Sequence, residues 1–273
     1  MLAEWLRHLT TPCPPKLKRM GYLKELISID ARHKRCFEPW APHLKHCKQV
    51  ILEAAQDVPR RRVTVLGSGL LMDIPLGALA DMFQDVVLVD ILHLPATQKR
   101  AAEWANVRLI TADLSSLVDA TWDHVREKRT GPLPTPKPET DLCQDSDLTI
   151  SANLLTQLPL APMGWVQDMA EDGGGYADDD IQAFARAIID HHLAFLEGLQ
   201  GRVCLLSETE RQIMDGDEML QDIDPLFGAA LPPSGLKWIW DIAPRPEITP
   251  KIDLRFRMTG IPDFKSARRP VDA

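Results

Sequence analysis

The stretch Val63-Thr-Val-Leu-Gly-Ser-Gly69 decides the fold that this sequence predicts. Its first four residues form a short β-branched run, which suits a strand buried on both faces of a parallel sheet. Gly67 and Gly69 let the backbone turn tightly and approach a ligand without a Cβ in the way. An apolar segment through Met82 follows and predicts a helix. The stretch therefore indicates a strand, a ligand-binding turn and a helix.

The alternation of strand and helix continues along the chain. Further strands are expected at 85–90, 107–111, 148–150 and 203–206, and helices at 97–104 and 181–199. This rhythm is typical of a doubly wound, mostly parallel α/β sheet. Two later segments, 237–240 and 252–258, are also expected to be strands. The second of them alternates apolar and charged residues, as a half-exposed strand does.

Polar side chains follow three of the predicted strands. Asp90 ends the second strand, Asp113 follows the third and Asn153 follows the fourth. The carboxyl ends of strands in an open α/β sheet present their side chains to the ligand. A carboxylate at Asp90 is placed to accept hydrogen bonds from ribose hydroxyls, and one at Asp113 from an adenine amino group. The pattern therefore predicts a nucleotide site.

These strand ends resemble those of a known enzyme family. The stretches 65–69, 87–90, 110–113 and 150–153 are similar to the successive strand-end motifs of class I (Rossmann-like) S-adenosylmethionine-dependent methyltransferases. The resemblance covers roughly residues 62–208. It implies a seven-stranded sheet with an antiparallel C-terminal hairpin, S-adenosylmethionine as the cofactor, and methyl transfer to a small-molecule or protein acceptor.

Two positions depart from the pattern of that family. An acidic residue is usual early in the first strand motif, where this chain has Val63 or Thr64. A third glycine is common where this chain has Leu71. The missing acid and the lack of an obvious base keep open a methyltransferase fold that binds ligands or partners without turnover. A nicotinamide-dependent oxidoreductase is the other alternative, and the missing third glycine and the antiparallel C-terminal pattern count against it.

The strand ends and the resemblance together indicate a set of site residues. The expected cofactor contacts are Gly67, Ser68, Gly69, Asp90, Ile91, Asp113, Leu114 and Asn153. Asn153 is also the first candidate for a catalytic role, in which it orients the acceptor or holds the amino group of the cofactor. An asparagine at this position could equally cap the following helix. Gln157 and Glu208 are candidates for binding the acceptor.

Residues 1–58 show no strand pattern and predict a helical N-terminal cap on an α/β domain of residues 59–273, with helices at 21–37 and 42–56. N-terminal helices in this fold often cover the substrate, so His33 is a second catalytic candidate. The alternative is that His33 belongs to an exposed, charged face of its helix. The proline-rich stretch 128–146 is expected to be a surface loop.

Histidine and cysteine side chains are frequent in this N-terminal region. His43 and Cys47 would share one helix face, and zinc accepts such ligands. The spacing matches no standard zinc pattern, so we predict no metal site.

Composition narrows the remaining possibilities. The chain of 273 residues is 45% hydrophobic with a net charge of -8, which favours a folded globular protein and makes a nucleic-acid partner unlikely. No apolar run approaches the roughly 20 residues that cross a bilayer, and the N-terminus lacks the order of a secretory signal. Five scattered cysteines fit a reducing compartment, so we expect a cytoplasmic protein. The oligomeric state is not indicated.

Overall fold

The computed structural model describes residues 2–137, 142–170 and 175–268. These residues form an eight-stranded sheet in the order β3-β2-β1-β4-β5-β8-β7, with β6 paired to β5. The strands are β1 (Arg62–Leu66), β2 (Asp85–Asp90), β3 (Val107–Thr111), β4 (Leu148–Ala152), β5 (Arg202–Asp215), β6 (Glu218–Ile223), β7 (Leu236–Ala243) and β8 (Ile252–Ile261).

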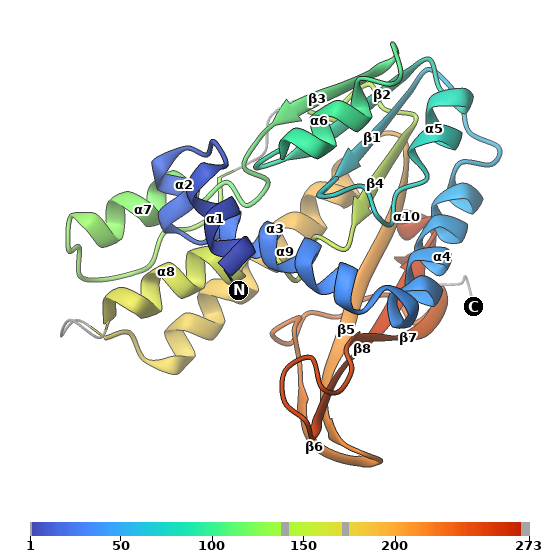
Figure 1. Ribbon diagram of the computed structural model, residues 1–273. Coiled ribbons are helices and arrows are strands. Elements are labelled where there is room, and N and C mark those ends of the chain that lie inside the picture. The colour runs from blue at the N-terminus through green and yellow to red at the C-terminus, as the bar shows by residue number, and fades with distance from the viewer. Residues whose placement is uncertain (1, 138–141, 171–174, 269–273) are drawn as a thin grey trace, which may run out of the picture.

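The first five strands are parallel, whereas β8 runs antiparallel to both β5 and β7. The predicted α/β class, the mostly parallel sheet and the antiparallel C-terminal hairpin are therefore confirmed. The predicted number of seven strands misses β6. It forms because β5 continues to Asp215, well beyond residue 206, and turns back on itself (Figure 1).

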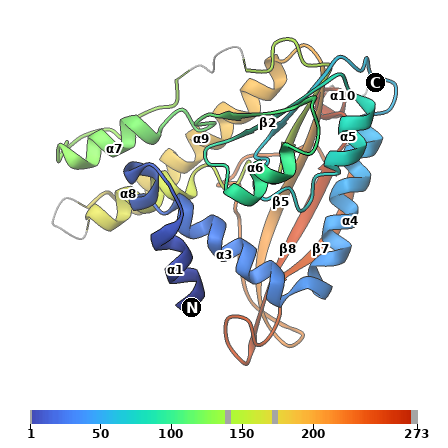
Figure 2. The same cartoon turned by 45° about the horizontal axis from the view of Figure 1, so that its top comes forward.

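Helices cover both faces of the sheet, as Figures 1 and 2 show. One face carries α4 (Phe37–Ala54), α5 (Leu76–Met82) and α6 (Pro95–Ala101), which share an apolar core with the sheet. The other carries α7 (Val118–Arg126), α8 (Leu160–Ala170), α9 (Asp178–Gly198) and α10 (Phe264–Arg268) around a second core. Both faces of the parallel strands are thus buried, which explains why β1 and β4 read as apolar runs.

The N-terminal helices α1 (Leu2–Thr10), α2 (Pro15–Arg19) and α3 (Tyr22–Arg35) precede this sandwich. Leu23 and Ile27 of α3 pack on Leu92 and Leu94, which follow β2, so α3 lies over the strand ends. The next helix, α4, is different, because Val50 on its inner side is fully buried against the sheet.

The apolar core of the α/β sheet therefore includes α4, and the division at residue 58 stays a prediction. This helix also begins at Phe37 instead of residue 42 and contains Pro42. Pro42 is the sixth residue of this helix, so it removes one backbone hydrogen bond, and the helix nevertheless continues to Ala54.

Within the predicted proline-rich loop, residues 128–137 and 142–146 contain neither helix nor strand, and 138–141 lie outside the described residues. Among the described residues, no helix is both long enough and apolar enough to cross a membrane.

Candidate functional site

A cavity of about 530 Å³ lies where the strand ends, α3, α4 and the C-terminal strands meet. Nine of its lining residues belong to the predicted set: Gly67, Gly69, Asp90, Ile91, Asp113, Leu114, Asn153, Gln157 and Glu208. We call the part lined by Gly67, Gly69, Asp90, Asp113 and Asn153 the strand-end half. We call the part lined by Trp40, His43, Trp240, Phe256 and Met258 the aromatic half.

The glycine turn leaves β1 in a conformation that its residues explain. Gly67 has a φ of 75°, and a Cβ there would lie 2.8 Å from the Cβ of Leu154. Gly69 has a φ of 49°, and the nearest atom to a Cβ built there would be 3.9 Å away. Leu71 also has a positive φ, 58°, although its side chain is fully buried. Leu71 thus has the left-handed backbone conformation that a third glycine would readily adopt at this position.

Asp90 is held firmly at the end of β2. One of its carboxylate oxygens accepts the Gly69 N–H at 2.7 Å, and the other accepts the Ile91 N–H at 2.8 Å. Burial raises the pKa of the Asp90 carboxyl, although these hydrogen bonds oppose the shift. The glycine turn and β2 therefore fix a carboxylate that faces the cavity.

Asp113 organises the turn after β3. Its oxygens accept the Ser115 N–H at 2.9 Å, the Ser115 hydroxyl at 2.6 Å and the Val118 N–H at 2.8 Å. These hydrogen bonds fix the Asp113 carboxylate in the cavity wall. The adjacent Leu114 adds an apolar wall to the cavity.

Asn153 does not cap a helix, contrary to one of the two interpretations of the sequence. Its φ is 50°, and its side-chain N–H donates to Asp73 at 2.7 Å. The next helix, α8, begins only at Leu160. The amide oxygen of Asn153 is buried and has no protein partner. Asn153 therefore presents an unpaired acceptor at the carboxyl end of β4, and Asp73 fixes its orientation.

Two predicted residues lie outside the cavity lining. Ser68 is fully buried, its hydroxyl has no protein partner, and its N–H donates to the Val89 carbonyl at 3.2 Å. His33 packs against the rings of Phe37 and Trp40, at centroid distances of 5.6 and 5.4 Å. Burial lowers the pKa of His33. The roles expected for these two side chains remain predictions.

Tyr22 takes a place that the sequence did not indicate. This first residue of α3 lines the cavity. Burial, followed by the nearby carboxylates of Asp113 and Asp90, raises the pKa of its phenol. Tyr22 is therefore a neutral phenol that covers the strand-end half.

Glu208 lies where β5 changes register with β8, between Glu208 and Glu210. Such a bulge re-aims side chains. Glu208 accepts hydrogen bonds from Thr156 at 2.5 Å and from Arg211 at 2.5 and 2.9 Å. Its charge is thus balanced inside the protein. Gln157, by contrast, is exposed at the rim of the cavity.

The aromatic half is built around Trp240. The His43 ring stacks on it at 3.8 Å and 5°, while Trp40 and Phe256 meet it edge to face at 4.8 and 5.7 Å. Trp238 donates its indole N–H to Nδ1 of His43 at 3.1 Å, so neutral His43 carries its proton on Nε2. Burial lowers the pKa of His43 to about 3.

A line of polar atoms joins the two halves. The Cys47 sulfur lies 3.5 Å from Nε2 of His43, and the Asn153 amide donates to the same sulfur at 3.5 Å. His43 and Cys47 do share a helix face, but no group of three metal-ligating side chains occurs within the part of the chain that the structure describes. This line of atoms places the His43 ring next to the end of β4.

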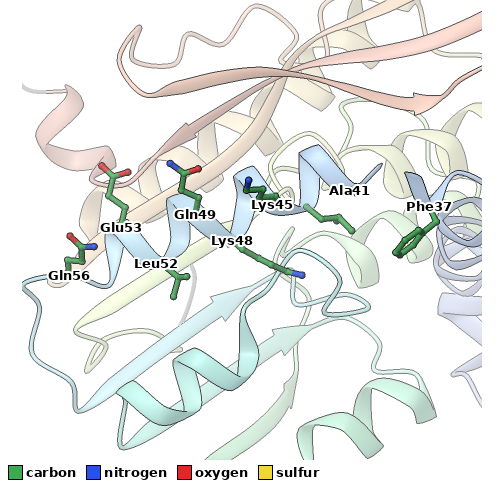
Figure 3. A pocket seen from close by; sticks show the side chains of 9 residues that line it. Phe37, Ala41, Lys45, Lys48, Gln49, Leu52, Glu53 and Gln56 are labelled. Carbon is green, nitrogen blue, oxygen red and sulfur yellow. The ribbon is translucent and has the colours of Figure 1, made fainter. Parts of the chain in front are cut away.

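A second hollow, of about 770 Å³, lies along the outer face of α4 (Figure 3). Its labelled lining residues run from Phe37 to Gln56 and come from this helix and its C-terminal end. It contains none of the strand-end residues, so the first cavity is the candidate site.

Comparisons with known proteins give similarity in structure alone. No family model and no curated protein sequence matches the chain. Among solved structures, it is similar to the YcgJ protein from Bacillus subtilis, with 14% identity over 60% of this chain and 51% of that one, at a TM-score of 0.31. The chain thus spans about half the length of that protein.

Two further solved structures match over more of their length. The N-methyltransferase NodS from Bradyrhizobium japonicum, in complex with S-adenosyl-l-homocysteine, is 11% identical over 81% of this chain and 87% of that one, at a TM-score of 0.39. The 1,6-didemethyltoxoflavin-N1-methyltransferase from Burkholderia thailandensis is 13% identical over 91% of both chains, at a TM-score of 0.37. The mostly parallel α/β sheet of this chain is defined by its own strand order and pairing.

Proposed function

We propose that this protein is an S-adenosylmethionine-dependent methyltransferase. The observation that carries the proposal is the convergence of Gly67, Gly69, Asp90, Asp113 and Asn153 on one cavity. These residues come from four successive strand ends, and each has the polarity or the backbone freedom that the cofactor would need. We also propose a cytoplasmic location, which the scattered positions of the five cysteines in the sequence support.

The residues of the strand-end half fit the parts of the cofactor. Asp90 would accept hydrogen bonds from the ribose hydroxyls, and Asp113 would accept one from the adenine amino group. The free amide oxygen of Asn153 would accept from the cationic amino group of the methionyl part. When bound, the cofactor supplies an electrophilic methyl group on a positively charged sulfur.

The contribution of the protein is mainly alignment and the exclusion of water. Tyr22 and the rest of α3 cover the strand ends, and Asp73 orients Asn153 beside them. His43 is not suited to act as a base, because its low pKa and its bond from Trp238 leave Nε2 as a donor. The acceptor would therefore need an atom that is already nucleophilic, or a carboxylate as its base.

The two alternatives differ in their support. A fold that binds the cofactor without turnover is favoured by the paired state of Glu208 and the neutral state of His43. A nicotinamide-dependent oxidoreductase is disfavoured by the sheet, because the dinucleotide-binding fold continues with a parallel sixth strand where this protein has the antiparallel β8.

Titration calorimetry with S-adenosylhomocysteine tests the proposal. We expect binding to the native protein, and Asp90→Asn should weaken it by about tenfold or more, because a buried charged acceptor is lost. Asp85→Asn is the matched control, since Asp85 lies at the opposite end of the same strand and pairs with Arg62 and Arg108. The control should bind within twofold of the native protein.

Absence of binding by the folded native protein would reject the methyltransferase proposal. Incubation with labelled S-adenosylmethionine and a cell extract then separates turnover from binding. A labelled product supports the enzyme, whereas binding without any labelled product supports the alternative without turnover.

A further inference from the structure

We propose that the aromatic half binds the methyl acceptor, and that this acceptor is a small planar aromatic acid. The inference rests on the proposed function, because it assigns the second substrate of the same site. Three observations carry it: a cluster of rings, the guanidinium group of Arg32, whose Nε has no hydrogen bond, and contact with the end of β4.

The shape of the aromatic half suits a flat ring. Trp240 is held in one orientation by the stacked His43 and by the edges of Trp40 and Phe256. Trp40 is itself fixed, since its indole N–H donates to the Ile242 carbonyl at 2.9 Å. Rigid aromatic walls favour aromatic ligands through stacked and edge-to-face contacts. The indole N–H of Trp240 is buried without a protein partner and offers the ligand a donor.

The charges around the aromatic half favour an anionic group on that ring. Arg32 and Arg211 line the cavity, and Arg211 is neutralised by Glu208. Arg32 lies 3.6 Å from Glu247, but that carboxylate is held by Arg35 at 2.6 Å. Arg35 also pairs with Glu4 at 3.0 Å, so three guanidinium groups meet three carboxylates, but Nε of Arg32 is buried without a hydrogen bond.

The opposite charge lines the strand-end half, where Asp73, Asp90 and Asp113 gather. A cationic cofactor on the acidic side and an anionic acceptor beside the Arg32 guanidinium would each meet a group of opposite charge. This arrangement also disfavours an ammonium ligand among the aromatic rings, although rings alone would accept one.

The position of the aromatic half is suitable for methyl transfer. His43 stacks on Trp240 and reaches Asn153 through the Cys47 sulfur, with 3.5 Å on each side of that sulfur. Thr156 and Glu208 line the cavity between the same strand end and Arg211. A ring bound against Trp240 would therefore lie beside the group that holds the cofactor. The volume of about 530 Å³ is in the range of small-molecule sites.

Calorimetry with four probes tests the acceptor class on the whole protein, with and without saturating S-adenosylhomocysteine. The probes are naphthoate, its neutral amide, naphthylmethylammonium and cyclohexanecarboxylate. We expect naphthoate to bind at least about tenfold more tightly than the other three, because only it combines the flat ring with the negative charge.

Variants locate the binding. Trp240→Leu should weaken naphthoate binding by about tenfold or more and leave S-adenosylhomocysteine binding within twofold. Trp5→Leu is the matched control, since Trp5 is exposed on α1. Arg32→Gln should weaken naphthoate but not its amide, and Arg257→Gln, from an exposed pair with Glu210, should weaken neither. If Trp240→Leu fails to fold, Phe256→Leu provides the same test.

The outcomes separate the two proposals. Four results would each overturn the acceptor class alone. Two concern the probes: equal binding of all four, or tighter binding of the ammonium. The others are naphthoate binding that the Trp240 and Arg32 variants do not change, and no naphthoate binding by protein that binds S-adenosylhomocysteine. Naphthoate binding that depends on Trp240 and Arg32 supports the subsite. If such protein fails to bind S-adenosylhomocysteine, the methyltransferase proposal fails instead.

Discussion

The two halves of the cavity are assembled from the chain in different ways. The strand-end half uses residues 67–153, in which each side chain follows a strand of the same parallel sheet. The aromatic half joins α3 and α4 to the last strands, as in the bond between Trp238 and His43, which are 195 residues apart. The strand-end half thus follows from the repeated strands of one sheet, whereas the aromatic half depends on tertiary contacts between distant parts of the chain.

The halves also differ in charge. The strand-end half carries carboxylates whose oxygens are held by backbone N–H groups, as at Asp90 and Asp113. The aromatic half carries guanidinium groups, among which Arg211 also lies over the Phe256 ring at 5.3 Å. A rigid acidic side, and a side lined with rings and guanidinium groups, suggest two ligands of different chemistry. Each prediction below tests one side against the other.

The largest effect is expected in the glycine turn of the strand-end half. Gly67→Ala should lower the free energy of unfolding by about 3 kcal/mol or more, because a left-handed alanine and a steric clash add together. The new Cβ would lie 2.8 Å from Leu154 and 3.2 Å from the Ala152 carbonyl. S-adenosylhomocysteine binding should be lost as well. Urea unfolding and calorimetry measure the two effects.

Gly69→Ala is the control within the same turn. Its φ is also positive, but the nearest atom to a new Cβ is 3.9 Å away. We expect a cost of about 1 to 2 kcal/mol, from the left-handed conformation alone. Equal costs for the two variants would show that the approach of β4 does not constrain the turn.

Much of the strand-end half could be predicted because its signals are local. A buried parallel strand reads as an apolar run, and the residue after it must reach the ligand edge of the sheet. Asp90 and Asp113 follow this rule and line the cavity. Asp73 was missed, because it lies in an irregular segment between the turn and α5, where no periodic pattern places a side chain.

The aromatic half could not be predicted in the same way. The charged face of α3 drew attention to His33, whereas the histidine that lines the cavity is His43 on α4. Only the packing of α4 on β7 decides this, and no pattern within either segment contains it. Glu208 was indicated as a strand-end residue, but the bulge and its pairing with Arg211 were not.

Two buried histidines allow a comparison of stability with pH. His43 belongs to the aromatic half, and His192 lies behind the strand-end half, where its Nε2 is 3.0 Å from the Ser151 hydroxyl. Burial lowers the pKa of each to about 3, from 6.5. Above pH 6.5 both rings are neutral in the folded and in the unfolded protein. As the pH falls toward 3, these rings gain protons only in the unfolded protein. Stability is therefore full above pH 6.5 and is lost below it.

We expect each histidine to contribute about 1.4 kcal/mol per pH unit to this loss between roughly pH 6 and 4. His43→Gln and His192→Gln should each reduce the slope of the unfolding free energy against pH by one proton, and the double variant by two. Urea unfolding over this pH range measures the slopes. Only His43→Gln should weaken naphthoate binding. A slope that neither variant changes would mean that these rings are protonated in the folded protein.

The smallest difference is expected between two variants of Leu71, the position where the turn lacks the third glycine. Its side chain is fully buried while its φ is 58°, so packing opposes backbone strain at one residue. Leu71→Ala should cost about 2 to 3 kcal/mol, because it loses the packing and keeps the strain. Leu71→Gly loses the same packing but removes about 1 kcal/mol of strain. Glycine should therefore be as stable as alanine here, or more stable, in urea unfolding. An alanine variant that is clearly more stable than the glycine variant would show that the turn after Gly69 does not require a left-handed residue. The strand-end half would then depend on left-handed backbone conformations at fewer positions than the constraint at Gly67 suggests.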